Sequence, residues 1–417
     1  MRALAWLRKL LRDTGGNVLA ITAASMPLVV GGAAMAIDTI QLSVWKRQLQ
    51  RAADSAAIAG AHAEAQGSSR DNAVHRDLSE NVFPTLSQPE VVQGGARLGF
   101  DRTVYVSLTA QRTVPFMSFF TNSATTITAE ATAALIEDGQ FCLLSLYDGP
   151  NTGIDANGNA DVDLTCGMGT NSESDNAVTA GGSSRIKARP ITARGGLDGD
   201  SQNFVPPTTL RPRSARLRDP FANVPLPTVP STCSETTLSV GNGVVTDPLP
   251  AGSCYAAWNI DGTLRLAPGT HYINGGLVDL KGRIESTGTG GVTIVMTGDE
   301  FNTDGDLIVG DFKQNGGGVL DIDAQETGPY RGIALYRDPR AVLLTVKING
   351  GADTDIRGAI YMPGTDLWLG GNADFNAQCL QVVARIITFR GGADIRNTCP
   401  SGGASQALRQ TIVRLVG

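Results

Sequence analysis

The hydrophobic pattern at the start of the chain predicts one long helix. Twenty-four uncharged residues separate Asp13 from Asp38. As a helix they measure about 36 Å, and the hydrocarbon core of a bilayer is about 30 Å thick. Beyond this run, apolar residues recur at three- to five-residue steps, as on one face of a helix. They are Ile40, Val44, Leu49, Ala52, Ala53, Ala56 and Ala57. The pattern predicts a membrane-spanning helix over residues 14–37 that continues outside the membrane.

Small residues within the uncharged run predict contact with a second helix. Gly31, Gly32 and Ala36 lie close together in the sequence. Small residues at four-residue spacing let two helices approach closely in lipid, where packing drives association. We predict that these three residues form a helix-packing site for another membrane protein.

A cleaved signal peptide is the alternative interpretation of the same run. Ala34-Met35-Ala36 has the A-x-A form of a cleavage site after an apolar stretch. The helical pattern nevertheless runs on past Ala36, and a signal peptide has no reason to share a helix with the mature domain. The pattern favours a retained anchor, and processing of the N-terminus stays open.

The remaining two thirds of the chain carry a repeat that begins with glycine. GGADTDIR begins at Gly350, GGNADFNA at Gly370 and GGADIRN at Gly391, a step of 20 to 21 residues. GNADVDL at Gly158 and GGSSRIKA at Gly181 begin 23 residues apart. A period of this length is typical of one coil of a β-solenoid, in which strands and turns stack on the coil beneath.

These patterns predict a mainly β chain with five parts. The 50 glycines and 6% aromatic residues agree with a fold rich in turns. The solenoid is expected to be a right-handed parallel β-helix with a proline-rich insertion, at about residues 204–258, lying on it. The parts are a basic cytoplasmic tail (1–13), the membrane helix (14–37), an extension helix plus strands forming a small α+β unit (38–138), the β-solenoid (139–403) and a C-terminal strand or helix (404–417).

The six cysteines fit the same period. Fifteen pairings are open to six cysteines, but residues one coil apart stack about 4.8 Å from each other, which suits a disulfide. We therefore predict sequential pairing in an oxidising compartment. The predicted disulfides are Cys142–Cys166, Cys233–Cys254 and Cys379–Cys399, with separations of 24, 21 and 20 residues.

Charge is divided unevenly along the chain. The first 51 residues carry a net charge of +5, which leaves −11 for the rest of a chain whose net charge is −6. The basic residues before the apolar run place the N-terminus in the cytoplasm and the bulk of the chain in the periplasm or outside the cell. Nucleic acid as a partner needs a basic face. In the acidic part of the chain beyond the anchor region only the run RPRSARLRD (211–219) is basic. We interpret it as a solvated loop and predict no nucleic-acid partner.

The N-terminal sequence resembles a known family. The order is Gly16-Asn17, an apolar run with a central proline, Ile37-Asp38, and RQLQRAADSAAIAGA at 47–61. Over about residues 12–65 it is similar to the N-terminal signature of TadG and TadE-like proteins of tight-adherence (Flp) pilus systems. Residues 104–135 resemble the two strands that follow in that family. The resemblance implies a pilin-like helix covered by strands, a role in pilus assembly, and pilus-assembly membrane proteins or pilin-like subunits as partners.

Two departures limit what this resemblance implies. Type IV pilins resemble the same layout but carry a glutamate five residues after their processing glycine, where this chain has Ile21. Larger family members carry an adhesion domain with an Asp-x-Ser-x-Ser metal motif, which this sequence lacks. Pilin-type cleavage after Gly16 and metal-dependent cell adhesion are therefore not carried over.

Candidate catalytic chemistry is sparse. The fragments NTD (302–304) and RIK (185–187) match pieces of polygalacturonase signatures, but in reversed order and without Gly-His-Gly. The histidines are His62, His75 and His271, and none of them adjoins a nucleophile motif. We predict no catalytic residue and no cofactor.

A calcium loop is the one metal pattern to weigh. DANGNADVD, starting at Asp155, places oxygen ligands at alternate positions. However, Ala160 stands where the EF-hand loop needs glycine, and Cys166 stands where it needs glutamate. We interpret the run as a polar coil edge and predict no metal site.

Two functions follow from the sequence. The first is a non-enzymatic component of pilus assembly, anchored in the cytoplasmic membrane by one helix, that presents an exported solenoid for protein or envelope contacts. The alternative is an anchored β-helix protein that binds or cleaves cell-envelope polysaccharide. Trp258 and Trp368 are the only tryptophans beyond the anchor region, a thin basis for a sugar-stacking platform.

Overall fold

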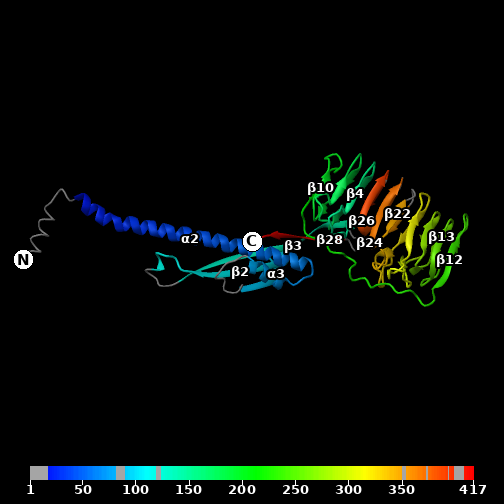
Figure 1. Ribbon diagram of the computed structural model, residues 1–417, viewed down its shortest axis with the longest axis horizontal. Coiled ribbons are helices and arrows are strands. Elements are labelled where there is room, and N and C mark those ends of the chain that lie inside the picture. Colours follow the sequence, from blue (N-terminus) through cyan, green and yellow to red (C-terminus); the bar gives the residue numbers. More distant parts are fainter. Residues whose placement is uncertain are drawn as a thin grey trace, which may run out of the picture. The chain divides into compact units, whose positions relative to one another are not determined.

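The computed structural model describes residues 17–80, 90–118, 124–349, 354–371, 374–392, 394–398 and 408–417. The chain divides into two compact units (Figure 1). The helix unit comprises residues 1–136 and 411–417, and the solenoid unit comprises residues 137–410. The solenoid is therefore an insertion within the sequence of the helix unit.

The helix unit is built on one uninterrupted helix of 49 residues. Strands β1 and β2 pair antiparallel, and β2 pairs antiparallel with the first part of β3, with Val104 opposite Ala133. At the C-terminus, Val416 N–H donates to Thr132 O at 2.9 Å, so the chain end returns to β3. The elements are α2 (Asn17–Ala65), α3 (Arg70–Glu80), β1 (Glu90–Arg97), β2 (Phe100–Arg112), β3 (Thr125–Ser145) and β28 (Leu408–Leu415).

Alanines explain how the second half of α2 packs against this sheet. Ala53, Ala57 and Ala61 are fully buried against β2 residues such as Val104. Short side chains let the sheet lie close to the helix axis. At Gly60 a Cβ atom would lie 3.1 Å from a methyl group of Val104 on β2 and 2.7 Å from a methyl group of Val74 on α3. The predicted continuation of the helix, and its covering by strands, are confirmed.

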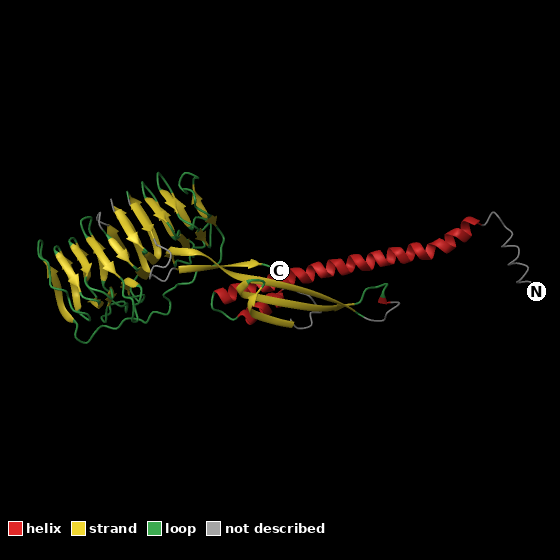
Figure 2. Ribbon diagram, turned by 180° about the vertical axis from the view of Figure 1, so that it is seen from behind, coloured by secondary structure: helices red, strands yellow, loops and turns green. Residues whose placement is uncertain are grey.

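The solenoid unit consists of parallel sheets whose strands stack coil upon coil (Figure 2). In space, the first sheet runs from β12 to β10. Its strands are β12 (Ser234–Val240), β13 (Cys254–Ile260), β16 (Leu277–Leu280), β19 (Asp311–Gln314), β22 (Thr345–Asn349), β24 (Ala359–Gly371), β26 (Gln381–Gly391), β4 (Ile154–Ala156), β7 (Val178–Ala180) and β10 (Leu197–Gly199).

The second sheet shares the long strands β24 and β26 with the first sheet, and it includes the end of β3. Its other strands are β15 (Gly269–Asn274), β18 (Val292–Thr297), β21 (Ile333–Arg337), β6 (Gly167–Thr170), β9 (Ile191–Ala193) and β11 (Leu210–Arg211). The third side is formed by two four-stranded sheets. They are β14 (Thr263–Leu266), β17 (Arg283–Ser286), β20 (Val319–Asp323) and β23 (Asp355–Arg357), and β25 (Asp374–Gln378), β27 (Asp394–Thr398), β5 (Asp161–Leu164) and β8 (Arg185–Lys187).

Every second side chain of a strand points into the solenoid and fills its interior. In β5, for example, Val162 is buried while Asp161 and Asp163 face outward, because successive side chains of a strand point to opposite faces. Val162 pairs in register with Ile186 on one side and Ile395 on the other. Such ladders of aliphatic residues form one continuous core, and the predicted parallel β-solenoid is confirmed.

The glycine repeat marks a coil corner. Gly158, Gly182 and Gly391 have φ values of 80°, 64° and 73°, a conformation that glycine adopts without strain. They stack, since Asn159 N–H donates to Gly391 O at 3.1 Å and Ser183 N–H donates to Gly158 O at 2.9 Å. The repeat in the sequence is therefore the same turn on successive coils.

The coils do not stack in sequence order. The chain enters the solenoid at β3, beside β26, and winds outward to β10 and β11 at one end. It then passes to the opposite end at β12 and winds back to β26 and β27 (Figure 1). The seam, where β26 and β27 meet β3, β4 and β5, joins residues far apart in the sequence. The solenoid is a permuted winding with its entry and exit in the middle.

Residues 212–233, here called the crossing segment, make the passage between the two ends. The ten described strands of the first sheet give nine spacings, or about 43 Å at about 4.8 Å each. The crossing segment has 22 residues, which reach about 73 Å when extended. The predicted insertion at 204–258 contains the crossing segment, which lies between strands. It also contains residues 234–240 and 254–258, which belong to strands β12 and β13 of the first sheet.

Disulfides link neighbouring coils. Cys142–Cys166 and Cys233–Cys254 form as predicted, with Cα–Cα distances of 5.8 Å and 4.5 Å. Cys379 is also disulfide-bonded. Its predicted partner, Cys399, lies outside the described residues.

Candidate membrane-anchoring site

The first half of α2 presents an apolar surface that the described chain leaves uncovered. Val18, Leu28 and Met35 are 77%, 78% and 75% exposed. The helix from Ile21 to Ala65 contains a stretch long and apolar enough, by length and composition, to cross a membrane. So large an apolar surface is unfavourable in water, and soluble monomers rarely expose one. The helix fits a single-pass membrane anchor.

The predicted helix-packing residues lie on two sides of α2. Neighbouring residues of a helix are about 100° apart, so Gly32 and Ala36 share one side, which is exposed, and half-buried Gly31 points elsewhere. A Cβ at Gly31 or Gly32 would have no atom of the described chain within 4 Å. Packing of a second helix here stays a prediction, and Gly32 with Ala36 offers the more open surface.

Asp38 is the first charged residue after the apolar run, and it is only 4% exposed. Its carboxylate accepts hydrogen bonds from the backbone N–H groups of Met117 at 2.7 Å and Phe116 at 3.3 Å. A carboxylate withdrawn from water needs such donors, because an unpaired buried charge is costly. The turn that follows β2 is therefore held against α2 at Asp38.

Polar contacts hold the second half of α2 in its unit. Gln50 Nε2 donates to Glu130 O on β3 at 2.7 Å, and Ser55 Oγ donates to Asp77 on α3 at 3.0 Å. Burial lowers the pKa of His62, which favours the neutral imidazole near pH 7. These contacts fix the helix to both α3 and the sheet.

The histidine of the solenoid is a core residue. His271 has no exposed surface, and its Nε2 is 2.9 Å from Ala267 O. Burial lowers its pKa. The side chain packs inside the coil and does not face a groove.

An open polar groove lies on the first sheet near β4 and β7, and its lining includes Asn151, Asp155, Thr179 and Thr388. Asp155 is the sole carboxylate among the described residues that line it. It accepts hydrogen bonds from Arg390 Nη2 at 2.7 Å and from Thr179 Oγ1. Glycoside hydrolysis needs two carboxyl groups about 5–9.5 Å apart. The groove supplies no such pair, and polysaccharide binding stays a prediction.

The run DANGNADVD, which was considered as a calcium loop, is spread over β4 and β5. Asp155 is paired with Arg390, and Asp163 accepts a hydrogen bond from Lys187 Nζ at 2.8 Å. Within the described residues, no group of three or more His, Cys, Asp or Glu side chains is placed to hold a metal ion.

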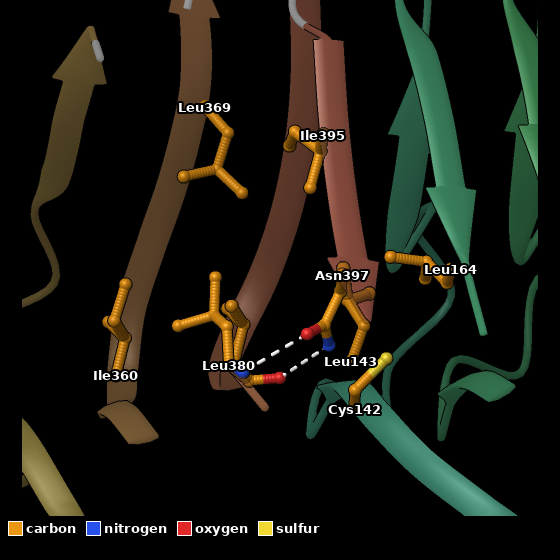
Figure 3. A pocket seen from close by; sticks show the side chains of 9 residues that line it. Cys142, Leu143, Leu164, Ile360, Leu369, Leu380, Ile395 and Asn397 are labelled. Atoms are coloured by element: carbon orange, nitrogen blue, oxygen red, sulfur yellow. Dashed lines mark hydrogen bonds between the residues drawn. The ribbon is translucent and has the colours of Figure 1, made fainter. Parts of the chain in front are cut away.

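A small apolar cavity lies inside the solenoid at the seam (Figure 3). Asn397 on β27 points into it and is 2% exposed. Its Nδ2 donates to Leu380 O at 2.7 Å, and its Oδ1 accepts from Leu380 N–H at 3.1 Å. Nδ2 also lies 3.4 Å from Cys166 Sγ. The amide therefore joins the second winding of the chain, from β12 to β27, to a disulfide of the first winding, from β3 to β11.

The crossing segment is held on the second sheet by specific contacts. Leu217 exchanges hydrogen bonds with the side chain of Asn171 at 2.7 and 3.0 Å. The ring of Phe221 lies 5.1 Å from that of Tyr361, and Arg340 Nη2 donates to Pro227 O at 2.9 Å. These partners follow β6, lie in β24 and follow β21, so the segment runs along the stack. The sequence predicted that this segment lies on the solenoid, but not which residues hold it there. The apolar Leu217 and Phe221, which stand among prolines and are buried, were the available signal.

The geometry defines a class: a β-solenoid inserted into a small α+β unit whose helix extends as a membrane-anchor candidate. Residues 16–63 match the family model described as Putative Flp pilus-assembly TadE/G-like, so the N-terminal segment is of the Tad type. The match confirms the N-terminal resemblance and supports a role in Flp pilus assembly, with other pilus components as interaction partners. Neither a curated protein nor a solved structure matches the chain.

Proposed function

We propose that the chain is a non-enzymatic, single-pass membrane component of Flp pilus assembly that presents its solenoid outside the cytoplasm. The observation that carries this proposal is the division of α2. Its first half is apolar and exposed, as at Leu28, whereas its second half is the alanine-rich core of a folded unit, as at Ala57. Both halves lie within the segment that matches the pilus-assembly family. One helix thus connects the membrane to a folded unit outside it.

The orientation follows from charge and disulfides. Arg2, Arg8, Lys9 and Arg12 precede the apolar run, and basic residues stay on the cytoplasmic side. The disulfides of the solenoid require an oxidising compartment, which supports placing it in the periplasm or outside the cell. Its partners are pilus-assembly membrane proteins or pilin-like subunits, met in the membrane through the side of α2 that carries Gly32 and Ala36.

A pair of charge substitutions tests the anchoring role. In cells that lack the chromosomal copy, the variant Leu28→Arg/Val29→Arg places two charges mid-helix, each costing about 2.5–3.5 kcal/mol in lipid. We expect loss from the carbonate-washed membrane fraction and loss of surface pili. Leu226→Arg, at a residue of the crossing segment that is 53% exposed, is the matched control. This variant should stay in the membrane fraction and support surface pili. Normal pili with the double variant released from the membrane would refute an anchored role.

A further inference from the structure

The turn after β2 has the surface of a membrane contact. Phe116 and Met117 are 39% and 47% exposed, and the turn from Val114 to Ser118 contains no charged side chain. Val114 is 2% exposed and fixes the turn from inside. Pro115 and Ser118 are residues that turns commonly carry, and Ser118 Oγ donates to Pro115 O at 2.9 Å. Between them the turn displays an aromatic ring and a thioether.

The exposed surface of α2 stays uncharged well past Asp38, with the hydroxyl residues Thr39 and Ser43 beside apolar ones. The turn covers Asp38, so its charge is hidden from the surroundings, and Ile40 and Val44 are 63% and 46% exposed. The next charged residues on the helix, Lys46 and Arg47, are both exposed. From Asp38 to Lys46 the helix rises about 12 Å. The boundary between uncharged and charged surface therefore lies near Lys46, and the turn lies on the uncharged side of it.

Trp45 and Arg112 stand at that boundary. The guanidinium of Arg112, at the end of β2, lies 5.5 Å from the centre of the Trp45 ring. Tryptophan is enriched at the level of lipid headgroups, and arginine extends its charge toward them while its stem stays in apolar surroundings. Lys46 and Arg47 follow Trp45 on the helix, so aromatic and basic groups suited to lipid phosphates lie near one level along α2.

We propose that the turn after β2 is a second membrane contact, inserted into the outer interfacial layer of the bilayer beside α2. This inference rests on the membrane anchoring proposed above. Phe116 and Met117 would lie among the upper acyl chains, with Trp45, Lys46, Arg47 and Arg112 at the headgroups. An interfacial layer is about 5–8 Å thick on each side, so the rise from Asp38 to Lys46 covers it. Two contacts fix the tilt of the helix unit on the membrane, which a single helix leaves free.

Spin labelling of the full-length protein in vesicles of phosphatidylethanolamine and phosphatidylglycerol tests this proposal. No described cysteine is free, so a label attaches to an added one. The variants are Phe116→Cys and Met117→Cys in the turn, Thr128→Cys at an exposed position of β3, and Ile21→Cys in the anchor. At each label, collision with oxygen, which concentrates in lipid, is compared with collision with a nickel chelate, which stays in water.

We expect oxygen to dominate at residues 21, 116 and 117, and the nickel chelate to dominate at residue 128. If residues 116 and 117 behave like residue 128 while residue 21 lies in lipid, the turn is aqueous and the second contact is refuted, although the anchor stands. Shielding from both reagents would point to a second copy of the chain covering the turn, and would also refute lipid contact. Nickel dominating at residue 21 would instead refute the anchoring itself.

Discussion

The phenol of Tyr361 donates a hydrogen bond of 2.8 Å to the carboxylate of Asp219. Tyr361 belongs to β24, which pairs with β26 near the end of the winding that starts at β12, and Asp219 belongs to the crossing segment. The ring of Tyr336 stacks on Tyr361 with centroids 5.5 Å apart. This pair therefore fixes the crossing segment to the coils that it bypasses.

Replacing Tyr361 by Phe should loosen the crossing segment. Half-buried Asp219 would lose a donor, and a hydrogen bond to a charged group contributes about 1.5–3 kcal/mol. We expect faster cleavage within residues 212–233 under limited proteolysis, with the coils intact. Tyr336→Phe is the matched control, because no hydrogen bond of its hydroxyl is found among the described residues. Equal cleavage of both variants would contradict a specific role for the Tyr361 hydroxyl.

The same pair predicts a pH dependence. Burial raises the pKa of Asp219 above its ordinary value of 3.8, against the opposing effects of hydrogen bonds from Phe221 N–H and Tyr361. A carboxyl whose folded pKa is raised contributes stability that is fully present below the unfolded pKa and is lost as pH rises through the folded pKa. Asp219→Asn stays neutral, so its free energy of unfolding should improve relative to wild type as pH rises from 3 to 7. The free energy of unfolding of both proteins is measured by denaturant titration at each pH. If it changes with pH equally in the two, the protonation of this carboxyl is not coupled to folding.

Gly60 tests the close packing of the helix unit. Although alanine and leucine favour helices over glycine, a side chain at Gly60 meets Val74 at 2.7 Å and Val104 at 3.1 Å. Gly60→Leu should therefore destabilise the unit by about 1–3 kcal/mol, the usual cost of overpacking. Gly32→Ala, where nothing in the described chain is near, should leave thermal unfolding followed by Trp45 fluorescence unchanged. A Gly60→Leu protein with wild-type stability would mean that the sheet lies farther from α2.

Gly32 tests the partner in the membrane. Gly32→Leu should keep a second helix a few ångströms away and reduce co-purification of other pilus components, because packing drives helix association in lipid. Gly31→Leu adds the same side chain on another side of the helix and should have the smaller effect. Unchanged co-purification with Gly32→Leu would remove this surface from the list of contacts, and a larger effect of Gly31→Leu would move the contact to the other side.

The parts of the fold that could be predicted are those encoded locally. Gly158, Gly182 and Gly391 occupy the same corner turn on neighbouring coils, and two of the cysteine pairs join neighbouring coils. The order of the coils was not encoded in this way. A coil edge pairs equally well with any edge of similar register, and the pairing of Ile387 with Ile154 joins residues remote in sequence. The contact of Asp38 was hidden for a related reason, because its partners are backbone amides, which carry no signature of their own.

The seam is where the permuted winding should fail first. Asn397 serves both the N–H and the C=O of Leu380, so Asn397→Ala leaves buried backbone groups unpaired, at about 1–3 kcal/mol each. To expose this loss, a specific protease site is inserted after Leu226. After cleavage the two fragments stay joined by the pairing of β26 and β27 at the seam, by the Asp219–Tyr361 hydrogen bond and by Val416 on β3. Neither described disulfide crosses the seam.

The cleaved wild-type protein should keep its fragments together in native buffer and separate them cooperatively in urea. The cleaved Asn397→Ala protein should separate at lower urea, as followed by size exclusion at each concentration. Asn242→Ala, at an exposed turn, controls for the loss of an amide and should match wild type. Fragments of cleaved wild type that drift apart without urea would show that the crossing segment, rather than the pairing of β26 with β3 and β4, holds the windings together.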